Sequence, residues 1–192
     1  MRLAIVDLAY GNIGSIELAF ERLGITPVLS ADPDEIAAAD RVVLPGVGAA
    51  GHAIGRIGQL GLRDCLKSLA QPALGICLGM QLLFDRSEED GGECLGIIPG
   101  KVRALEPAAG RPVPHMGWSK VEVFATDLGL RSGDYVYFAH GYAADPGAAT
   151  VASADYGREI PAVVRRGNWL GAQFHPERSG EAGARFLKAF LQ

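Results

Sequence analysis

The chain has 192 residues, of which 48% are hydrophobic and 21% are charged. That apolar content excludes a disordered chain, and the length favours one domain, residues 1–192, over two. The 18 basic and 22 acidic residues give a formal net charge of −4, which argues against a surface for nucleic acid or anionic membrane.

The sequence predicts neither a membrane span nor a signal peptide nor a metal site built from cysteines. The longest uncharged stretch, residues 68–84, is too short and too interrupted by Gln, Pro and Gly to span a membrane. The apolar start of the chain ends at Asp7, which is too early for a signal peptide. Cys65, Cys77 and Cys94 do not have metal-type spacing, so we expect free thiols, no metal and a cytoplasmic protein.

Apolar runs alternate with helical patterns in the first half of the chain. We expect strands at 3–6, 26–29, 41–44 and 73–76. We expect helices at 13–23, 34–39 and 54–69, and a further helical run that ends at 84. Strands this apolar, alternating with helices, are typical of a parallel sheet that is covered on both faces.

Shorter β-like runs occupy the second half of the chain, after a polar loop at 85–93. We expect strands at 101–105, 120–124, 135–138, 150–153, 161–165 and 169–174, and a closing helix at 183–191. The turn at 166–168 favours antiparallel hairpins. The predicted fold is therefore α/β, with an open, mostly parallel central sheet flanked by helices and additional antiparallel β-structure in the C-terminal half.

The segment Gly75-Ile76-Cys77-Leu78-Gly79 lies where an apolar strand is expected to turn into a helix. Its pattern is that of a nucleophile elbow, in which a side chain two residues either side of the nucleophile would clash. The turn would place the Cys77 sulfur at the N-terminus of the helix, which favours a thiolate, and aim the Leu78 amide at an oxyanion. The alternative is that Cys77 only fills the core.

The segment Gln173-Phe174-His175-Pro176-Glu177 offers a base for this thiol. Pro176 disfavours helical dihedral angles at His175, so we expect an extended chain there. Residues two apart in an extended chain face the same way, so Glu177 is expected to orient the imidazole of His175 as the third member of a triad. The alternative is an ordinary surface His–Glu pair.

The segment 45–51, Pro-Gly-Val-Gly-Ala-Ala-Gly, matches the G-x-G-x-x-G pattern of dinucleotide-binding proteins. That pattern belongs after the first strand of such a unit, with an acid about 20 residues further on. Here it follows the third strand, and the nearest acid, Asp64, falls in an expected helix. We therefore expect the backbone N–H groups of this turn to face the acyl carbonyl beside Cys77. A nucleotide-binding oxidoreductase is the alternative. The remaining histidines, His52, His115 and His140, are each expected to be structural.

Together these segments resemble a known family. The class I, triad-type glutamine amidotransferases, which have a flavodoxin-like fold, are similar in three segments: G-I-C-L-G-M-Q at 75–81, P-G-V-G at 45–48 and F-H-P-E at 174–177. Within that family, the glutaminase subunits of imidazole glycerol phosphate synthase, of histidine biosynthesis, are similar in three more: H-M-G-W at 115–118, Y-F-A-H at 137–140 and D-L-A-Y-G-N at 7–12. The resemblance covers essentially the whole chain.

This resemblance implies a reaction that needs no cofactor. Cys77 would attack the carboxamide of glutamine, His175 would pass the thiol proton to the departing ammonia, and water would hydrolyse the thioester to glutamate. The oxyanion hole would comprise Gly46, Val47 and Leu78, and the Gly46–Val47 peptide would reorient only when a loaded partner is bound. Glutamine would be held by Gln81, Glu89, Gly141 and Tyr142.

The resemblance also implies a partner, a separate cyclase subunit with a (β/α)₈ barrel. That partner would use the ammonia to make imidazole glycerol phosphate and aminoimidazole carboxamide ribotide. The positions that match the family's subunit interface are Trp118, Tyr137 and Arg178. Arg178 stands where lysine is more frequent, Gly141 replaces a hydroxyl residue, and Leu8-Ala9 is unusual. Two alternatives stay open: a paralogue that delivers ammonia to another acceptor, and a catalytically silent binding subunit.

Overall fold

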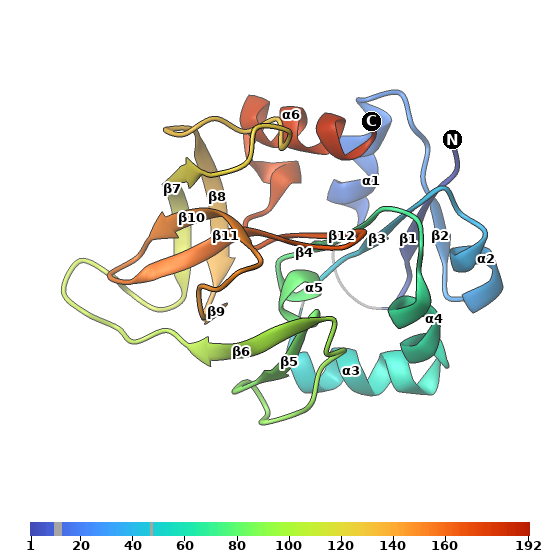
Figure 1. Cartoon of the computed structure of the whole chain (residues 1–192), viewed down its shortest axis with the longest axis horizontal. Coiled ribbons are helices and arrows are strands. Elements are labelled where there is room, and N and C mark those ends of the chain that lie inside the picture. The colour runs from blue at the N-terminus through green and yellow to red at the C-terminus, as the bar shows by residue number, and fades with distance from the viewer. Residues whose placement is uncertain (10–12, 47) are drawn as a thin grey trace.

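Strands alternate with helices in the first half of the computed structural model, which describes residues 1–9, 13–46 and 48–192 (Figure 1). The strands are β1 (Leu3–Val6), β2 (Val28–Ser30), β3 (Arg41–Leu44) and β4 (Ala73–Ile76). The helices are α1 (Gly14–Glu21), α2 (Pro33–Ala37), α3 (Ala50–Gln59), α4 (Leu62–Ser68) and α5 (Leu78–Gln81). The single helix expected at 54–69 is wrong: Gly61 adopts a φ of 69° and separates α3 from α4.

The second half is mostly β-structure. Its strands are β5 (Phe84–Ser87), β6 (Ile98–Ala104), β7 (His115–Val123), β8 (Tyr135–His140), β9 (Tyr142–Ala144), β10 (Thr150–Asp155), β11 (Glu159–Arg166) and β12 (Trp169–Ala172). The 3₁₀ turn η1 (Pro176–Arg178) and helix α6 (Gly180–Phe190) end the chain. The helical run expected to end at 84 is wrong, because α5 ends at Gln81 and Phe84 begins β5, which continues into the expected polar loop. Sequence patterning did not predict β5, because its two middle residues, Asp85 and Arg86, are both exposed.

The main sheet joins parallel and antiparallel strands. In the described part of the chain it has nine strands, in the order β2-β1-β3-β4-β12-β11-β10-β7-β8. The neighbours from β2 to β12 run parallel, and those from β12 to β8 run antiparallel. The strands β5, β6 and β9 form a separate small sheet. The predicted α/β fold is confirmed, and most of the C-terminal strands extend the parallel sheet.

Helices cover both faces of the parallel strands, because successive side chains in these strands point to opposite faces. Leu3 and Ile5 of β1 pack in one buried cluster with residues of α1 and α6. Ala4 and Val6 pack in a second cluster with residues of α2, α3 and α4. Figure 1 shows α1 and α6 above the sheet and α3 and α4 below it. No helix in residues 1–9, 13–46 and 48–192 is long and apolar enough to cross a membrane.

Candidate active site

Three adjacent parallel strands, β3, β4 and β12, end at the same edge of the sheet. Their register pairs Leu44 with Gly75 and Ile76 with Ala172. The glycine-rich turn follows Leu44, Cys77 follows Ile76, and His175 comes three residues after Ala172. Segments far apart in the sequence therefore meet at the carboxyl edge, where open α/β sheets bind their ligands.

The backbone around Cys77 forms the expected elbow. Cys77 has a φ of 54° and a ψ of −109°, a conformation that costs a non-glycine residue about 1–3 kcal/mol. A Cβ atom on Gly75 would lie 2.6 Å from the Gly79 oxygen, and one on Gly79 would lie 2.1 Å from the Leu44 oxygen. The Cys77 N–H donates to the Ala172 oxygen at 2.7 Å, which ties the elbow to β12. The two glycines are therefore required by close backbone approach.

The Cys77 thiol and the His175 imidazole line the same cavity. Cys77 is 7% exposed, and its small exposed part lies in a cavity that can admit a substrate. His175 is extended, with a φ of −96° and a ψ of 98°, as Pro176 predicted. The Nδ1 atom of His175 lies 2.8 Å from the Glu177 Oε1 atom. Glu177 reaches this position from the 3₁₀ turn η1, not from the continued extended chain that was expected.

The electrostatics of the site favour a charged imidazole. Burial lowers the pKa of His175, but hydrogen bonds with Cys77 and Glu177 and the charges of both groups together raise it to about 10. The second carboxylate oxygen, Glu177 Oε2, is buried and has no hydrogen-bond partner among the described residues. The hydrogen bond from His175 to Oε1 is therefore the main side-chain contact of this carboxylate. A protonated imidazole at this place can donate a proton to a leaving group.

Gly46 lies directly against the start of α5. A Cβ atom on Gly46 would be 2.0 Å from the Gly79 nitrogen and 2.5 Å from the Leu78 carbonyl carbon. Because α5 begins at Leu78, the Leu78 N–H has no acceptor within the helix. Two of the three residues predicted for the oxyanion hole are thus brought together beside Cys77. The third, Val47, lies outside the described residues, so the orientation of the Gly46–Val47 peptide stays a prediction.

The cavity at Cys77 has a volume of about 260 Å³. That is slightly below the roughly 300–1,000 Å³ of sites for drug-sized ligands, which suits a molecule the size of an amino acid. Its lining comprises Gly46, Gly48, Cys77, Leu78, Gln81, Glu89, Ala139, His140, Gly141, Tyr142 and His175. All four residues predicted to hold glutamine are among them. Ala139 and His140 were not predicted there.

Two of the predicted substrate-binding side chains are themselves held in place. Gln81 is 3% exposed, and its Nε2 atom donates to the Tyr142 carbonyl at 2.7 Å and to Gln173 Oε1 at 3.0 Å. The Glu89 Oε2 atom accepts from the Ala50 N–H at 2.9 Å, at the start of α3. These bonds fix one polar group on each of two cavity walls.

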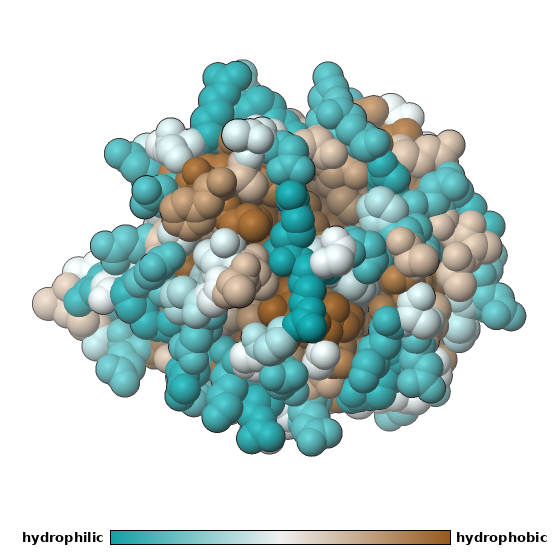
Figure 2. Space-filling model, viewed as in Figure 1, coloured by the Kyte–Doolittle hydropathy of each residue, from teal (hydrophilic) through white to brown (hydrophobic). Residues whose placement is uncertain are grey.

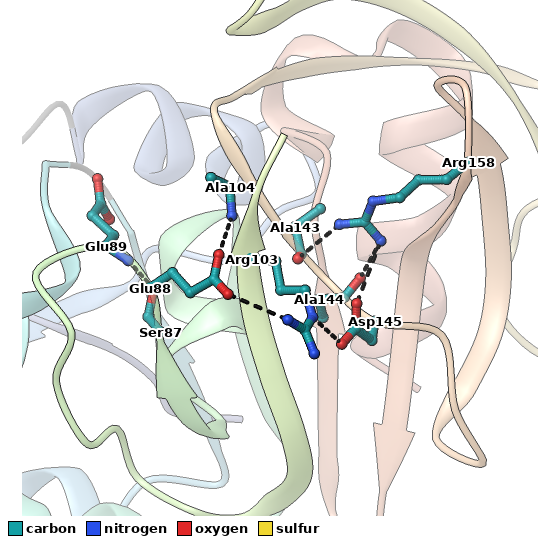
Figure 3. Close-up of polar contacts among 9 residues, drawn as sticks. All are labelled: Ser87, Glu88, Glu89, Arg103, Ala104, Ala143, Ala144, Asp145 and Arg158. Atoms are coloured by element: carbon teal, nitrogen blue, oxygen red, sulfur yellow. Dashed lines mark hydrogen bonds and ion pairs between the residues drawn. The ribbon is translucent and has the colours of Figure 1, made fainter. Parts of the chain in front are cut away.

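Charged side chains connect the Glu89 loop to β9, as Figure 3 shows. Glu88 accepts from the Ala104 N–H at 3.0 Å and pairs with Arg103 at 3.4 Å. Arg103 pairs with Asp145 at 2.7 Å, and Asp145 pairs with Arg158 at 3.7 Å. Arg158 in turn donates to the carbonyls of β9 residues 143 and 144. Because β9 begins at Tyr142, this chain of ion pairs links two walls of the cavity.

A larger hollow of about 600 Å³ lies between β6 and β11 and contains none of the predicted site residues. Phe84, Ile98 and Val164 contribute its apolar lining. Figure 2 shows separate groups of hydrophobic residues near the middle of this face, on either side of a hydrophilic side chain that crosses it. Chemistry and size therefore separate the two cavities, and the smaller one holds the nucleophile.

The three residues predicted at a subunit interface gather beside His175. The Trp118 and Tyr137 rings meet edge to face with centroids 5.9 Å apart, and the Arg178 guanidinium lies 4.3 Å from the centre of the Tyr137 ring. The Tyr137 carbonyl accepts from the His175 N–H at 2.8 Å. Trp118 is 54% exposed, and Met116, two residues before it on β7, is 63% exposed. The sequence did not single out Met116.

The fold, with the cysteine elbow, the histidine and the glycine-rich turn at one edge of the sheet, is that of a class I glutamine amidotransferase. The family model "Glutamine amidotransferase class-I" matches residues 5–192, and the chain belongs to this family. Within it, the chain is 49% identical to imidazole glycerol phosphate synthase subunit HisH of Xanthomonas axonopodis pv. citri (strain 306), covering 98% of this chain and 96% of that one. It is 44% identical to the same subunit of Idiomarina loihiensis, covering 100% and 98%. The chain is therefore a member of the HisH family, as its sequence motifs predicted.

Solved structures show the same fold at lower identity. A crystal structure of a glutamine amidotransferase has a TM-score of 0.76 at 21% identity, covering 98% of this chain and 96% of that chain. The glutaminase domain of Trypanosoma brucei CTPS with bound acivicin has a TM-score of 0.70 at 17% identity, covering 100% and 94%. At these identities the likeness concerns the fold alone.

Proposed function

We propose that this chain hydrolyses L-glutamine at Cys77 and supplies the ammonia to the cyclase subunit of imidazole glycerol phosphate synthase, in the cytoplasm. The observation that supports this most is the elbow cysteine beside a charged histidine, in an amino-acid-sized cavity. The names of the relatives supply the pathway, because they are subunits of that synthase. The strand position of the glycine-rich turn, after β3, weighs against a nucleotide-binding oxidoreductase.

The reaction follows the order of a thiol hydrolase. The Cys77 sulfur attacks the side-chain carbonyl of glutamine, and the resulting oxyanion is stabilised by the Leu78 N–H and the Gly46–Val47 peptide. His175 donates its proton to the amide nitrogen, the carbon–nitrogen bond breaks, and ammonia leaves. A water molecule then gives one proton to His175 and attacks the thioester, and glutamate is released as the thiolate returns. Glu177 holds His175 in the required tautomer throughout.

Polar groups on the cavity walls suit the amino-acid end of glutamine. Gln81 and Glu89 supply acceptors for its ammonium group, and the backbone at Gly141 and Tyr142 supports its carboxylate end. The replacement of a hydroxyl residue by Gly141 leaves the backbone available, so the absence of that hydroxyl does not remove the subsite.

The exposed residues Trp118 and Arg178, with the half-buried Tyr137 between them, form the surface for the cyclase, a (β/α)₈ barrel. Trp118 supplies a large apolar area that is 54% exposed in the isolated chain, and aromatic residues dominate the energetics of protein interfaces. The surface adjoins His175 through the Tyr137 carbonyl, so ammonia released at Cys77 has a short way to the partner.

Substitution of the nucleophile tests the proposal. Cys77→Ala is expected to abolish glutamate release from glutamine, whereas the control Cys65→Ala, in a second free thiol on α4, is expected to retain it. Thermal unfolding of both variants verifies the fold. Undiminished turnover by Cys77→Ala would exclude the triad. Tight binding of NAD(P) to the wild type would favour the oxidoreductase instead.

Addition of the partner tests the second half of the proposal. The isolated chain is expected to hydrolyse glutamine slowly, and the rate is expected to rise by orders of magnitude when a barrel cyclase and its ligand are added. A chain that is already fully active alone would contradict this coupling. Ammonia transfer to a different acceptor, with no response to the cyclase, would favour a paralogous function.

A further inference from the structure

Two buried histidines have no part in the proposed reaction. His115 opens β7 and His140 ends β8, and the two lie opposite each other in the antiparallel pair. They are 2% and 6% exposed. The His115 ring is stacked between Phe138 and Tyr156, with centroids 4.7 Å and 3.8 Å away. Polar rings in such a setting require defined hydrogen-bond partners.

Hydrogen bonds join these rings into a chain that ends at the glutamine cavity. The Ser119 hydroxyl lies 2.9 Å from His115 Nε2, and His115 Nδ1 lies 3.2 Å from His140 Nε2. His140 Nδ1 lies 2.8 Å from the Tyr142 carbonyl oxygen. That carbonyl also accepts from Gln81 Nε2 at 2.7 Å.

The direction of this chain follows from its last acceptor. The Tyr142 carbonyl can only accept, so His140 Nδ1 carries the proton. Burial lowers the pKa of His140 to about 3 and that of His115 to about 4, so both rings are neutral. His140 Nε2 therefore accepts from His115 Nδ1–H, and His115 Nε2 accepts from the Ser119 hydroxyl. All donors point towards the cavity.

The last hydrogen bond of this series, between Gln81 and the Tyr142 carbonyl, determines which atom of the Gln81 carboxamide faces a ligand. Tyr142 and Gln173 take both N–H groups of the Gln81 carboxamide. Among the described residues the Gln81 oxygen accepts no hydrogen bond, and Gln81 lines the cavity. This oxygen is therefore the part of Gln81 that is available to a bound ligand, and it is an acceptor.

We propose that Ser119, His115 and His140 are positioning residues that hold the Tyr142 carbonyl against Gln81, so that Gln81 presents an acceptor to the α-ammonium group of L-glutamine. This proposal rests on the proposed function. An ammonium group has only donors, so an N–H in place of that oxygen would repel it. This series of hydrogen bonds thus determines the selectivity for an α-amino acid and does not take part in the chemistry of the Cys77 thiol.

A pair of substrates separates positioning from structural damage. Glutaramate has the carboxamide and the carboxylate of glutamine but no α-ammonium group. His115→Phe preserves the stacked ring and removes both ring nitrogens, and His115 does not line the cavity. It is expected to lower kcat/KM for glutamine on the order of 10-fold, mainly through KM, and to change that for glutaramate by less than about twofold.

Three further variants complete the test. Ser119→Ala, which is less disruptive, is expected to lower the glutamine-to-glutaramate preference in the same direction. His115→Asn, whose amide N–H₂ can replace the Nδ1 donor, is expected to restore most of it. The control Tyr156→Phe removes only a hydroxyl that donates to the Pro112 carbonyl at 2.6 Å, and both substrates are expected to react as in the wild type.

Equal losses for the two substrates in His115→Phe and Ser119→Ala, or no loss in either, would overturn the positioning role. A wild-type chain that hydrolyses neither substrate in the presence of the cyclase would contradict the proposed function itself. The two failures are therefore distinguishable. Should His115→Phe not fold, Ser119→Ala decides between the first two outcomes.

Discussion

The tight crossing at the elbow predicts a large effect for a single added methyl group. In Gly79→Ala, the new Cβ atom would lie 2.1 Å from the Leu44 oxygen and 3.0 Å from its carbonyl carbon, both in the backbone. The end of β3 and the start of α5 would have to separate by more than 1 Å to reach ordinary contact at 3.4 Å. Such overpacking costs about 1–3 kcal/mol, which exceeds the gain of up to about 1 kcal/mol from replacing a helical glycine.

The same displacement would move the glycine-rich turn away from the Leu78 amide. A misplacement of about 1 Å at a reacting centre can lower the rate about 100-fold, so we expect a fall of that order in kcat for glutamine. Urea unfolding and glutamate release with the cyclase present measure the two effects.

Gly55→Ala in α3 is the matched control, because nothing lies within 4 Å of its Cβ position. It is expected to raise the free energy of unfolding by up to about 1 kcal/mol and to leave kcat unchanged. A Gly79→Ala protein with wild-type stability and wild-type kcat would refute the argument that backbone contact holds the elbow.

Further predictions concern pH, surface charge and the partner. In the unfolded chain His140 takes up a proton below its ordinary pKa of 6.5, whereas burial in the folded protein lowers its pKa to about 3. Protonation therefore favours the unfolded state, and the free energy of unfolding falls as the pH falls below 6.5. Between pH 7 and 5 this contributes about 2 kcal/mol, and urea titrations should show that much less pH dependence in His140→Phe. Arg103→Ala should leave the unfolding free energy in urea almost unchanged, because its ion pairs are half exposed and solvent screens them. Trp118→Ala should weaken cyclase binding by about 2 kcal/mol or more in titration calorimetry; unchanged affinity would argue against this surface.

Local patterns in the sequence were sufficient for the elbow and for the strands that carry it. Gly75 and Gly79 flank Cys77 at a strand end, and both positions exclude a side chain in the structure. The bounds of β1, β3 and β4 agree with the expected ones, because a run of apolar residues between polar or turn residues has little freedom to shift. Pro176 likewise predicts the extended backbone at His175.

Elements that depend on tertiary contacts were not predictable in this way. The short strands β5 and β9 exist because they pair with β6, and nothing in their own sequences alternates clearly. The break at Gly61 depends on a positive φ that a glycine permits and does not require. The sequence predicted only that His115 and His140 are structural, and it did not predict their contact. That contact depends on the register between β7 and β8, which places the two residues opposite each other.

The structure suggests why one sheet carries both the reaction and the proposed partner surface. The parallel half supplies the sharp strand-to-helix turn at Cys77, and β12 brings His175 to the same edge. The antiparallel half then adds β7 and β8, whose Trp118 and Tyr137 are cross-strand partners. The Tyr137 carbonyl accepts from the His175 N–H, so the strand that carries the Tyr137 ring also holds the backbone of His175. A partner that shifts β8 would therefore act directly on the position of His175, without any intervening element.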